Sequence, residues 1–388
     1  MQVYKSKARW GILFSILLLL ILFPSCQPQA KGTIKIGTLF AVTGGASNLG
    51  APEEKTIKML VEEINAQGGF DGRKIEVVYK DTQSKSENAV ALAKQLIEEN
   101  QVLAILGPTT SGESLAVKDL CNKNNTILIS CAAAESIVVP VTPWVFKTPQ
   151  MDSFAVQKIY QDMQQKGYKN IAILTANSGF GQGGRAQLEK YAAKYGINIV
   201  VKEEYSASAT DLTDVVTKVK AANVDAIVNW SIEPAQSIVI KNIRQLGLKQ
   251  QIYQSHGFGN IKYAQAAGAA AEGVIFPCGR IFAIDVLPDS HPQKKVLKEY
   301  KNKYEARFNE EVSSFGGHAY DALMILLTAI KLADSTEPEK VREAIERVKN
   351  FAGTGGVFNF SSSDHNGLTI EAFEMLTVKD GKFALYNK

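Results

Sequence analysis

The sequence is poor in the residues that metal and thiol chemistry require. Its 388 residues include only four cysteines and four histidines. No Cys-x-x-Cys pair and no Cys/His spacing typical of a zinc site occurs. His-Glu-x-x-His, Gly-x-Ser-x-Gly and a carboxylate pair with a recognisable partner are also missing. We therefore expect no metal, no cofactor and no catalytic residues, although a Ser/His/Asp site assembled only in space stays an alternative.

Long blocks of one charge are missing as well. Charged residues make up 21% of the chain, and the formal net charge is +4. Three of the basic residues, Lys5, Lys7 and Arg9, lie in the first nine positions with no acid among them, so the rest of the chain is close to neutral. This charge balance gives no reason to expect a nucleic-acid partner.

No apolar run is long enough to span a membrane. The longest one, residues 11–23, follows the three basic residues and precedes Pro24-Ser25-Cys26. A spanning helix needs about 20 apolar residues. We predict a signal peptide over residues 1–25, with a permanent anchor helix as the alternative.

Leu22-Phe23-Pro24-Ser25-Cys26 resembles a bacterial lipobox. The resemblance implies that Cys26 is lipidated and becomes the mature N-terminus, so that residues 26–32 tether the protein to a membrane surface. Cys121, Cys131 and Cys278 then remain. An odd number excludes a full disulfide framework, at most one pair forms, and buried thiols are the default expectation.

What is present is a regular alternation of strand and helix patterns. It predicts an α/β fold, with two doubly wound parallel-sheet lobes joined by a hinge that the chain crosses three times, near residues 148, 278 and 357. Three late helices complete the first lobe, and a hairpin with an Asp-Gly turn completes the second. The predicted bounds are 33–148 with 278–356 for lobe 1, and 149–277 with 357–388 for lobe 2. A hinge over a cleft implies closure around a ligand.

Two apolar runs end abruptly in small residues, at Leu103–Gly112 and Thr126–Glu135. Each run reads as a buried parallel strand, so the small residues lie at the sheet edge where ligands of open α/β sheets bind. Thr110 and Ser111 precede a helix that begins at about Gly112, which suits a carboxylate. An ordinary Ser/Thr helix cap is the alternative interpretation.

Two glycine-rich stretches resemble nucleotide motifs. Gly179–Gly184 satisfies G-x-G-x-x-G, but three residues separate it from the preceding strand and an exported protein would not ordinarily meet a nicotinamide cofactor. Gly107–Ser114 resembles a phosphate-binding loop with Glu113 in place of its lysine, and an acid would repel phosphates. We expect no nucleotide. Aromatic residues near strand ends are candidates to line a cleft instead: Phe180, Trp230, Phe258 and Phe315.

Five stretches carry a resemblance to a known family: Ile34–Gly37 with Thr43-Gly44, Glu62–Gly69 with Gly72-Arg73, Tyr79–Asp81 with Ser84, Ile105–Pro108, and Tyr320–Ala322. Through them the chain from Ile34 to about Tyr386 resembles periplasmic binding proteins of the leucine/isoleucine/valine type, the solute receptors of ABC importers. The resemblance implies a monomeric exported lipoprotein, periplasmic or on the cell surface, that passes a small solute to an ABC permease. A sensory ectodomain and, less favoured, an exported α/β enzyme are the alternatives.

The resemblance also implies site residues. Ser111, with Thr110 beside it, and backbone groups of Ala132, Ala133 and Ala134 would hold a ligand carboxylate. Phe180 stands where the family usually has a tyrosine, His256 where it has an acid for the α-ammonium, and Leu49 where some members have an aromatic residue. Since a histidine does not replace a permanent carboxylate, we hypothesise a ligand with an acid head and an apolar or aromatic body that needs no α-amine. Branched-chain amino acids are the family default. The expected ligand contacts are Leu49, Thr110, Ser111, Ala132, Ala133, Ala134, Phe180, Trp230, His256 and Phe315.

Overall fold

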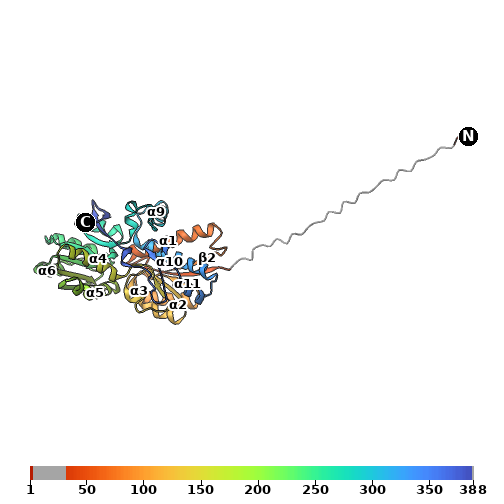
Figure 1. Ribbon diagram of the computed structural model, residues 1–388. Coiled ribbons are helices and arrows are strands. Elements are labelled where there is room, and N and C mark those ends of the chain that lie inside the picture. The colour runs from red at the N-terminus through yellow and green to blue at the C-terminus, as the bar shows by residue number, and fades with distance from the viewer. Residues whose placement is uncertain (3–31, 387–388) are drawn as a thin grey trace. The chain divides into compact units, whose positions relative to one another are not determined.

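The computed structural model describes residues 1–2 and 32–386. The signal peptide, the lipidated Cys26 and nearly all of the tether fall outside the described residues, so they stay predictions. Residues 32–388 form one compact unit, and its described part holds two large sheets flanked by helices (Figure 1). The predicted α/β fold with two parallel-sheet lobes is confirmed. We call the five-stranded sheet with its helices the first lobe and the seven-stranded sheet with its helices the second lobe.

The first sheet is entirely parallel, in the order β2-β1-β3-β4-β5. Its central strands are apolar on both faces because helices cover both sides. Ala104 and Leu106 join one core cluster while Ile105, between them, joins another. The strands are β1 (Ile34–Phe40), β2 (Ile75–Asp81), β3 (Ala104–Leu106), β4 (Ile127–Ser130) and β5 (Val145–Lys147).

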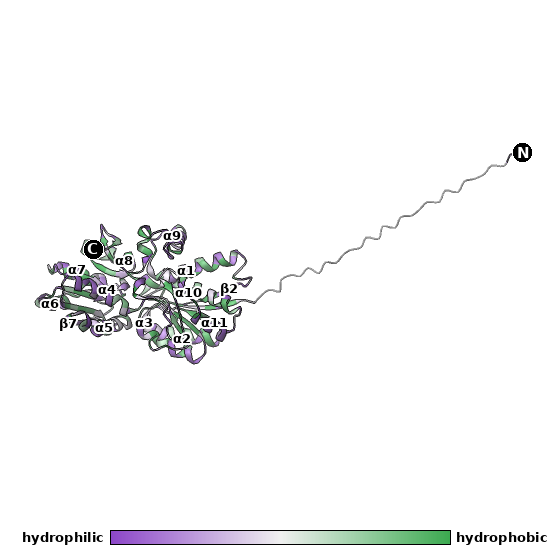
Figure 2. Cartoon of the chain, in the orientation of Figure 1, coloured by the Kyte–Doolittle hydropathy of each residue, from purple (hydrophilic) through white to green (hydrophobic). Residues whose placement is uncertain are grey.

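The helices of the first lobe divide between these two faces. Side chains of α1, α9, α10 and α11 share one core cluster with the sheet, while α2 and α3 share the other and lie side by side. Along the helices, hydrophobic and hydrophilic residues alternate (Figure 2). The bounds are α1 (Ser47–Ala66), α2 (Ser86–Glu98), α3 (Ser111–Lys123), α9 (Lys294–Phe308), α10 (Ser314–Ala333) and α11 (Pro338–Glu346).

The second sheet has the order β14-β13-β10-β9-β8-β6-β7. Strands β7, β6, β8, β9 and β10 are parallel, and β13 and β14 continue the sheet as an antiparallel hairpin around Asp380-Gly381, as predicted. The strands are β6 (Asn170–Ala176), β7 (Asn198–Tyr205), β8 (Ala226–Trp230), β9 (Gln251–Gln254), β10 (Ile275–Cys278), β13 (Glu374–Lys379) and β14 (Lys382–Leu385).

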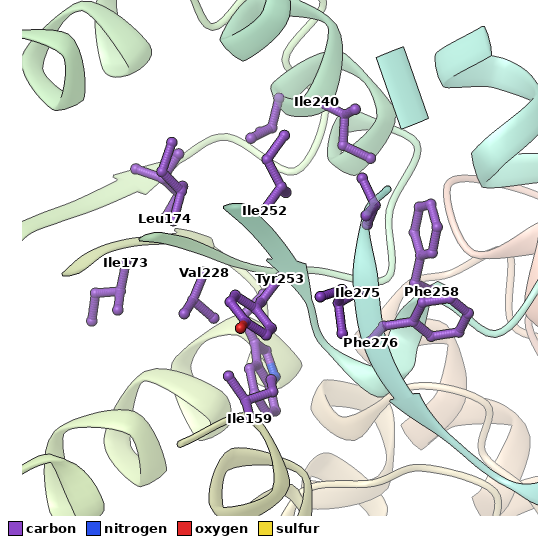
Figure 3. Close-up of a cluster of buried hydrophobic side chains, with 14 of the residues drawn as sticks. Ile159, Ile173, Leu174, Val228, Ile240, Ile252, Tyr253, Phe258, Ile275 and Phe276 are labelled. Atoms are coloured by element: carbon purple, nitrogen blue, oxygen red, sulfur yellow. The ribbon is translucent and has the colours of Figure 1, made fainter. Parts of the chain in front are cut away.

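The core of the second lobe follows the strand pleat. Ile173, Val228, Tyr253 and Ile275 are register partners across four strands, so their side chains point to one face. Figure 3 shows Ile173 and Val228 on the side of Ile159, and Leu174 and Ile252 on the opposite side. The helices are α4 (Asp152–Gln165), α5 (Gly179–Ala192), α6 (Thr213–Ala221), α7 (Ala235–Gln245) and α8 (Ile261–Ala267).

The chain passes between the lobes in three places, between β5 and α4, between β10 and α9, and between β12 and β13. β11 (Phe351–Ala352) and β12 (Val357–Phe358) form a two-stranded ribbon before the last crossing. The residue bounds of the lobes given by the sequence stay predictions. Short 3-10 turns complete the described chain: η1 (Glu135–Ile137), η2 (Ala193–Tyr195), η3 (His256–Phe258), η4 (Gly268–Ala271), η5 (Arg280–Phe282), η6 (Ile284–Val286) and η7 (Ile370–Ala372).

The helical spacing of apolar residues in the sequence predicts helices over Pro52–Asn65 and Arg185–Lys194, and both begin more than one turn earlier in the structure. Helix α5 starts at Gly179 rather than Arg185, because the Ser178 hydroxyl accepts from the N–H of Gly181 and caps it. Its glycines serve packing: a Cβ on Gly181 would lie 1.9 Å from the Ala176 carbonyl oxygen, and one on Gly184 would lie 2.1 Å from Trp230 Nε1. Helix α1 starts at Ser47, more than one turn before the predicted Pro52.

Candidate ligand-binding site

The junction between β3 and α3 is built around a capping box. The Thr110 hydroxyl accepts from the N–H of Glu113, and the Glu113 carboxylate accepts from the N–H of Thr110 at 3.0 Å. This arrangement leaves Ser111 as the first helical residue, 1% exposed. Its hydroxyl oxygen accepts from the N–H of Ala134 at 3.2 Å, so the ends of β3 and β4 are joined directly. The hydroxyl hydrogen of Ser111 stays available to another acceptor.

Thr109 connects the same edge to a buried acid. Its hydroxyl accepts from the N–H of Ala41 at 3.0 Å and donates to the carboxyl group of Glu53 in α1. Burial raises the pKa of Glu53 well above its ordinary value, and Glu113 nearby raises it further, against the hydrogen bond from Thr109. The other oxygen of Glu53 has no hydrogen-bond partner among the described residues.

A small cavity lies where both lobes meet, and we call it the inner cavity. It has a volume of about 20 Å³, and every residue that lines it is buried. The first lobe supplies residues from α1, the ends of β3 and β4, and α10, while the second lobe supplies residues from the ends of β6, β8 and β9. The lining residues are Leu49, Thr109, Ser111, Cys131, Ala132, Ala133, Pro149, Phe180, Ile232, His256, Gly257, Phe315 and His318.

Seven of the ten residues that the sequence indicated line this cavity: Leu49, Ser111, Ala132, Ala133, Phe180, His256 and Phe315. The other three lie next to it. Thr110 faces a groove outside, Ala134 reaches the site through its N–H to Ser111, and Trp230 packs against Phe180 and His256 with ring centroids 5.7 Å apart. Phe258 belongs to the core of the second lobe, where its ring contacts Phe276 (Figure 3). The roles of all these residues stay predictions.

Six lining residues were not anticipated: Thr109, Cys131, Pro149, Ile232, Gly257 and His318. Thr109 and Cys131 are neighbours of indicated positions, so the strand-end argument came within one residue of them. His318 lies on α10, far along the chain from the strand ends, and no local pattern connects it to them. The thiols of Cys121, Cys131 and Cys278 are all buried and unpaired, the arrangement expected by default.

His256 sits inside an aromatic enclosure. The ring centroids of Phe180, Trp230 and Phe373 lie 5.3, 5.7 and 5.4 Å from its own. Its Nε2 is 3.5 Å from Oδ1 of Asp152. Burial lowers the pKa of His256 well below its ordinary value, and the charge of Lys147 lowers it further. Burial likewise lowers the pKa of His318 to about 3. Both imidazoles are therefore neutral at physiological pH.

A buried lysine and a buried acid flank the inner cavity. Lys147 is 0% exposed, and its ammonium donates to the carbonyl oxygens of Ala133 at 2.5 Å and Gln150 at 3.4 Å. Asp152, also 0% exposed, is the first residue of α4. Burial lowers the pKa of Lys147 and raises that of Asp152, while each charge acts against the shift of the other. The two residues belong to different lobes, on either side of the first crossing.

A larger groove of about 830 Å³ opens next to the inner cavity. Residues of both lobes line it, including the starts of α3 and α5, and we call it the outer groove. Phe180 and Ile232 line both spaces, so they separate the inner cavity from the outer groove.

The two lobes touch around these spaces. The Asn260 side chain in the second lobe donates to the carbonyl oxygen of Asn48 in the first at 2.8 Å. Lys190 in α5 lies 3.5 Å from Glu135 in η1. Among the described residues, no group of three or more His, Cys, Asp or Glu side chains is placed to hold a metal ion. Within the same part of the chain, no helix has the length and apolar character needed to cross a bilayer.

Comparison with known proteins places this geometry in a family. Residues 33–382 match the profile of the family described as periplasmic binding protein. The chain belongs to the periplasmic binding protein family. The resemblance to its leucine/isoleucine/valine type is confirmed by relatives that bear that name. Among them, the leucine-, isoleucine-, valine-, threonine- and alanine-binding protein of Pseudomonas aeruginosa is 26% identical over 340 residues, covering 86% of this chain and 87% of the relative.

Solved structures of binding proteins share the fold. An extracellular ligand-binding receptor from Rhodopseudomonas palustris is 27% identical, with a TM-score of 0.86 over 91% of this chain and 99% of that one. A branched-chain amino acid transporter substrate-binding protein from Streptococcus pneumoniae, in complex with isoleucine, is 29% identical, with a TM-score of 0.80 over 90% of this chain and 97% of that one. These relatives are named as binding proteins, in keeping with a protein that binds its ligand without converting it.

Proposed function

We propose that this chain is the exported solute-binding lipoprotein of an ABC importer, which captures a small carboxylate-bearing ligand between two closing lobes and delivers it to a membrane permease. The observation that carries the proposal is the inner cavity, where the Ser111 hydroxyl and backbone groups after β4 face Phe180 and His256 of the other lobe. Contacts from one ligand to both lobes favour the closed state over the open one.

The first-lobe side of the cavity suits an anionic head. Ser111 opens α3, where N–H groups without helical partners and the helix dipole favour negative charge. Its hydroxyl hydrogen is free to donate, since its oxygen already accepts from Ala134. The N–H of Ala133 has no partner among the described residues. The Lys147 ammonium, 2.5 Å from the Ala133 carbonyl oxygen, adds a buried positive charge behind these donors.

The remaining walls suit an apolar or aromatic body. Leu49, Phe180, Ile232 and Phe315 supply most of the apolar lining. With a volume of about 20 Å³, the inner cavity has room for about one water molecule while the lobes touch. A ligand of the proposed size therefore needs the lobes farther apart than they are here, both to enter and to be held between them.

Binding of matched acids and amides to the purified mature protein tests the ligand class. We expect carboxylates to raise the melting temperature and their amides to leave it unchanged. The names of the relatives make leucine, isoleucine and valine the reference amino acids, beside short-chain and aromatic acids without an amine. Binding of the amides as tightly as the matching acids would contradict the ligand class proposed here.

Ser111→Ala should weaken acid binding about tenfold, the cost of one lost hydrogen bond to a charged group. The matched control is Ser136→Ala, because Ser136 is exposed and lies outside the cavity lining. Calorimetric titration of both variants gives the comparison. Equal affinities of the two variants would contradict the role of Ser111.

Anchoring and transport are tested in cells. Cys26→Ala should release the protein from the membrane fraction, because the diacyl chain on that cysteine is the proposed anchor. Loss of the gene should abolish uptake of a labelled ligand, and the ligand recovered from purified protein should be chemically unchanged. Conversion of the ligand to a product would contradict the binding function.

A further inference from the structure

Two histidines face the inner cavity from opposite lobes. His256 follows β9 in the second lobe, and His318 lies on α10 in the first. Their side chains are buried, at 7% and 5% residue exposure. Among the described residues, neither ring nitrogen of His256 has a hydrogen-bond partner, nor does Nδ1 of His318. Burying a polar group without a hydrogen-bond partner is unfavourable. These nitrogens therefore indicate a ligand group that forms the missing hydrogen bonds.

The local charges describe what that group is. Lys147 opposes protonation of both imidazoles, and burial acts in the same direction. The same positive field opposes an ammonium group bound between them. Asp152 does not line the cavity, and its charge is offset by Lys147 in the same buried environment. The histidine side of the cavity therefore offers hydrogen bonds without a net counter-charge for a cation.

Asp152 lies close to His256 without satisfying it. Its Oδ1 is 3.5 Å from Nε2, and neither atom forms a hydrogen bond. Both ring nitrogens of His256 therefore stay open to a ligand. A neutral imidazole presents one donor and one acceptor, and a hydroxyl group presents the same pair.

We propose that the inner cavity selects a 2-hydroxy acid over the matching 2-amino acid, with the ligand carboxylate at Ser111 and Ala133 and its hydroxyl group between His256 and His318. The carboxylate-binding groups and the two histidines line the same cavity, so a head with the hydroxyl on the carbon next to the carboxylate presents one polar group to each side. This inference rests on the proposed carboxylate-binding function and names the ligand class of the same site.

Three head groups on three bodies test the selection. Lactate, alanine and propanoate share a short body. 2-Hydroxy-4-methylpentanoate, leucine and 4-methylpentanoate share a branched one, and 3-phenyllactate, phenylalanine and 3-phenylpropanoate share an aromatic one. Ligand affinities are measured by calorimetric titration at pH 7. Among the three compounds that share the best-fitting side chain, the 2-hydroxy acid should bind at least about tenfold more tightly than the amino acid or the unsubstituted acid, the effect of one additional buried hydrogen bond.

Variants of the two histidines separate specificity from folding. His256→Leu and His318→Leu should each reduce the preference for the hydroxyl over hydrogen, and His256→Glu should shift the preference toward the 2-amino acid by supplying an anion. Circular dichroism and thermal melting establish that each variant is folded. His291→Gln is the control, because His291 is partly exposed and outside the cavity, and its preferences should match those of the unaltered protein.

The outcomes distinguish the two proposals. If a 2-amino acid or an acid with neither group binds as tightly as its 2-hydroxy counterpart, this inference is wrong while the carboxylate-binding function stands. If none of the nine compounds binds the folded protein, the carboxylate-binding function fails and the inference fails with it. If His256→Leu and His318→Leu both keep the full preference for the hydroxyl, the histidines do not provide it and the inference is wrong.

Discussion

Gly112 and Gly179 approach each other across the two lobes, at the starts of α3 and α5. A Cβ atom on Gly179 would lie 2.7 Å from the backbone nitrogen of Gly112 and 2.8 Å from its Cα. The reverse is not true, since a Cβ on Gly112 would meet nothing closer than the Ser86 hydroxyl at 3.6 Å. The close approach of the lobes therefore depends on the missing side chain of one glycine and tolerates a methyl group on the other.

Gly179→Ala should hinder closure, because backbone atoms of the opposite lobe cannot move aside as a flexible side chain can. We expect ligand affinity to fall by about tenfold or more, the effect of about 1.4 kcal/mol against the closed state. Small-angle scattering with saturating ligand should show a less compact protein than the parent. Gly112→Ala is the matched control and should bind as the parent does. Equal affinity of the two variants would show that this contact does not limit closure.

Glu53→Gln should stabilise the protein at neutral and higher pH. Burial raises the pKa of Glu53, so the native state keeps a proton that the unfolded state loses above its ordinary pKa. Stability contributed by this group is full at low pH and falls as pH rises toward the native pKa. Urea unfolding at pH 5 and pH 8 should show the gain at pH 8 only. Glu311→Gln, at an exposed position, should give no such difference.

His256 and His318 should not titrate between pH 5 and pH 8. Burial lowers both pKa values, to about 3 for His318, so both rings stay neutral across this range. NMR of ring-labelled protein should show constant chemical shifts for these two residues, with His291 as the partly exposed comparison. Below about pH 6.5 the imidazoles of the unfolded state bind protons, while the buried rings of the native state do not. The free energy of unfolding should therefore fall as the pH decreases through this range. A titration midpoint near 6.5 for either ring would contradict their neutrality.

Lys147→Met should destabilise the protein by about 3 kcal/mol, because it leaves Asp152 as an unpaired buried acid. Asp152 escapes part of the penalty by keeping a proton, so the loss should grow as pH rises. Adding Asp152→Asn should recover part of the stability and remove that pH dependence, as urea unfolding can measure. Lys340→Met breaks an exposed pair with Glu337, whose side chains are 60% and 57% exposed, and should cost less than about 1 kcal/mol. Similar losses for the two lysine variants would contradict the importance of burial.

The sheet edges could be predicted because strand periodicity and small residues are local signals. Leu103–Leu106 and Thr126–Ser130 contain the apolar strands β3 and β4, and the residues after them do line the inner cavity. Ser111 and Ala133 could be predicted in this way. The late helices and the Asp380-Gly381 hairpin could be predicted for the same reason, since helical periodicity and an Asp-Gly turn are local sequence patterns.

What could not be predicted depends on residues that the fold brings together. The 3.5 Å approach of Asp152 to His256 joins positions from different elements, and no spacing in the sequence indicates it. His318 enters the cavity from a helix whose periodicity shows only that it is buried. The start of α5 was missed because six residues that include four glycines favour a loop by intrinsic propensity, while close packing against Ala176 and Trp230 requires glycine inside a helix.

The separation of the inner cavity from the outer groove has a kinetic consequence. Phe180 and Ile232 stand between the two spaces, and every residue that lines the inner cavity is buried. An enclosed molecule therefore cannot escape until the lobes part, and its residence time is bounded below by the waiting time for that event. Weakly and tightly bound ligands would then have the same maximum dissociation rate, set by how often the lobes part. A permease that forces the lobes apart on docking would determine when the ligand is released.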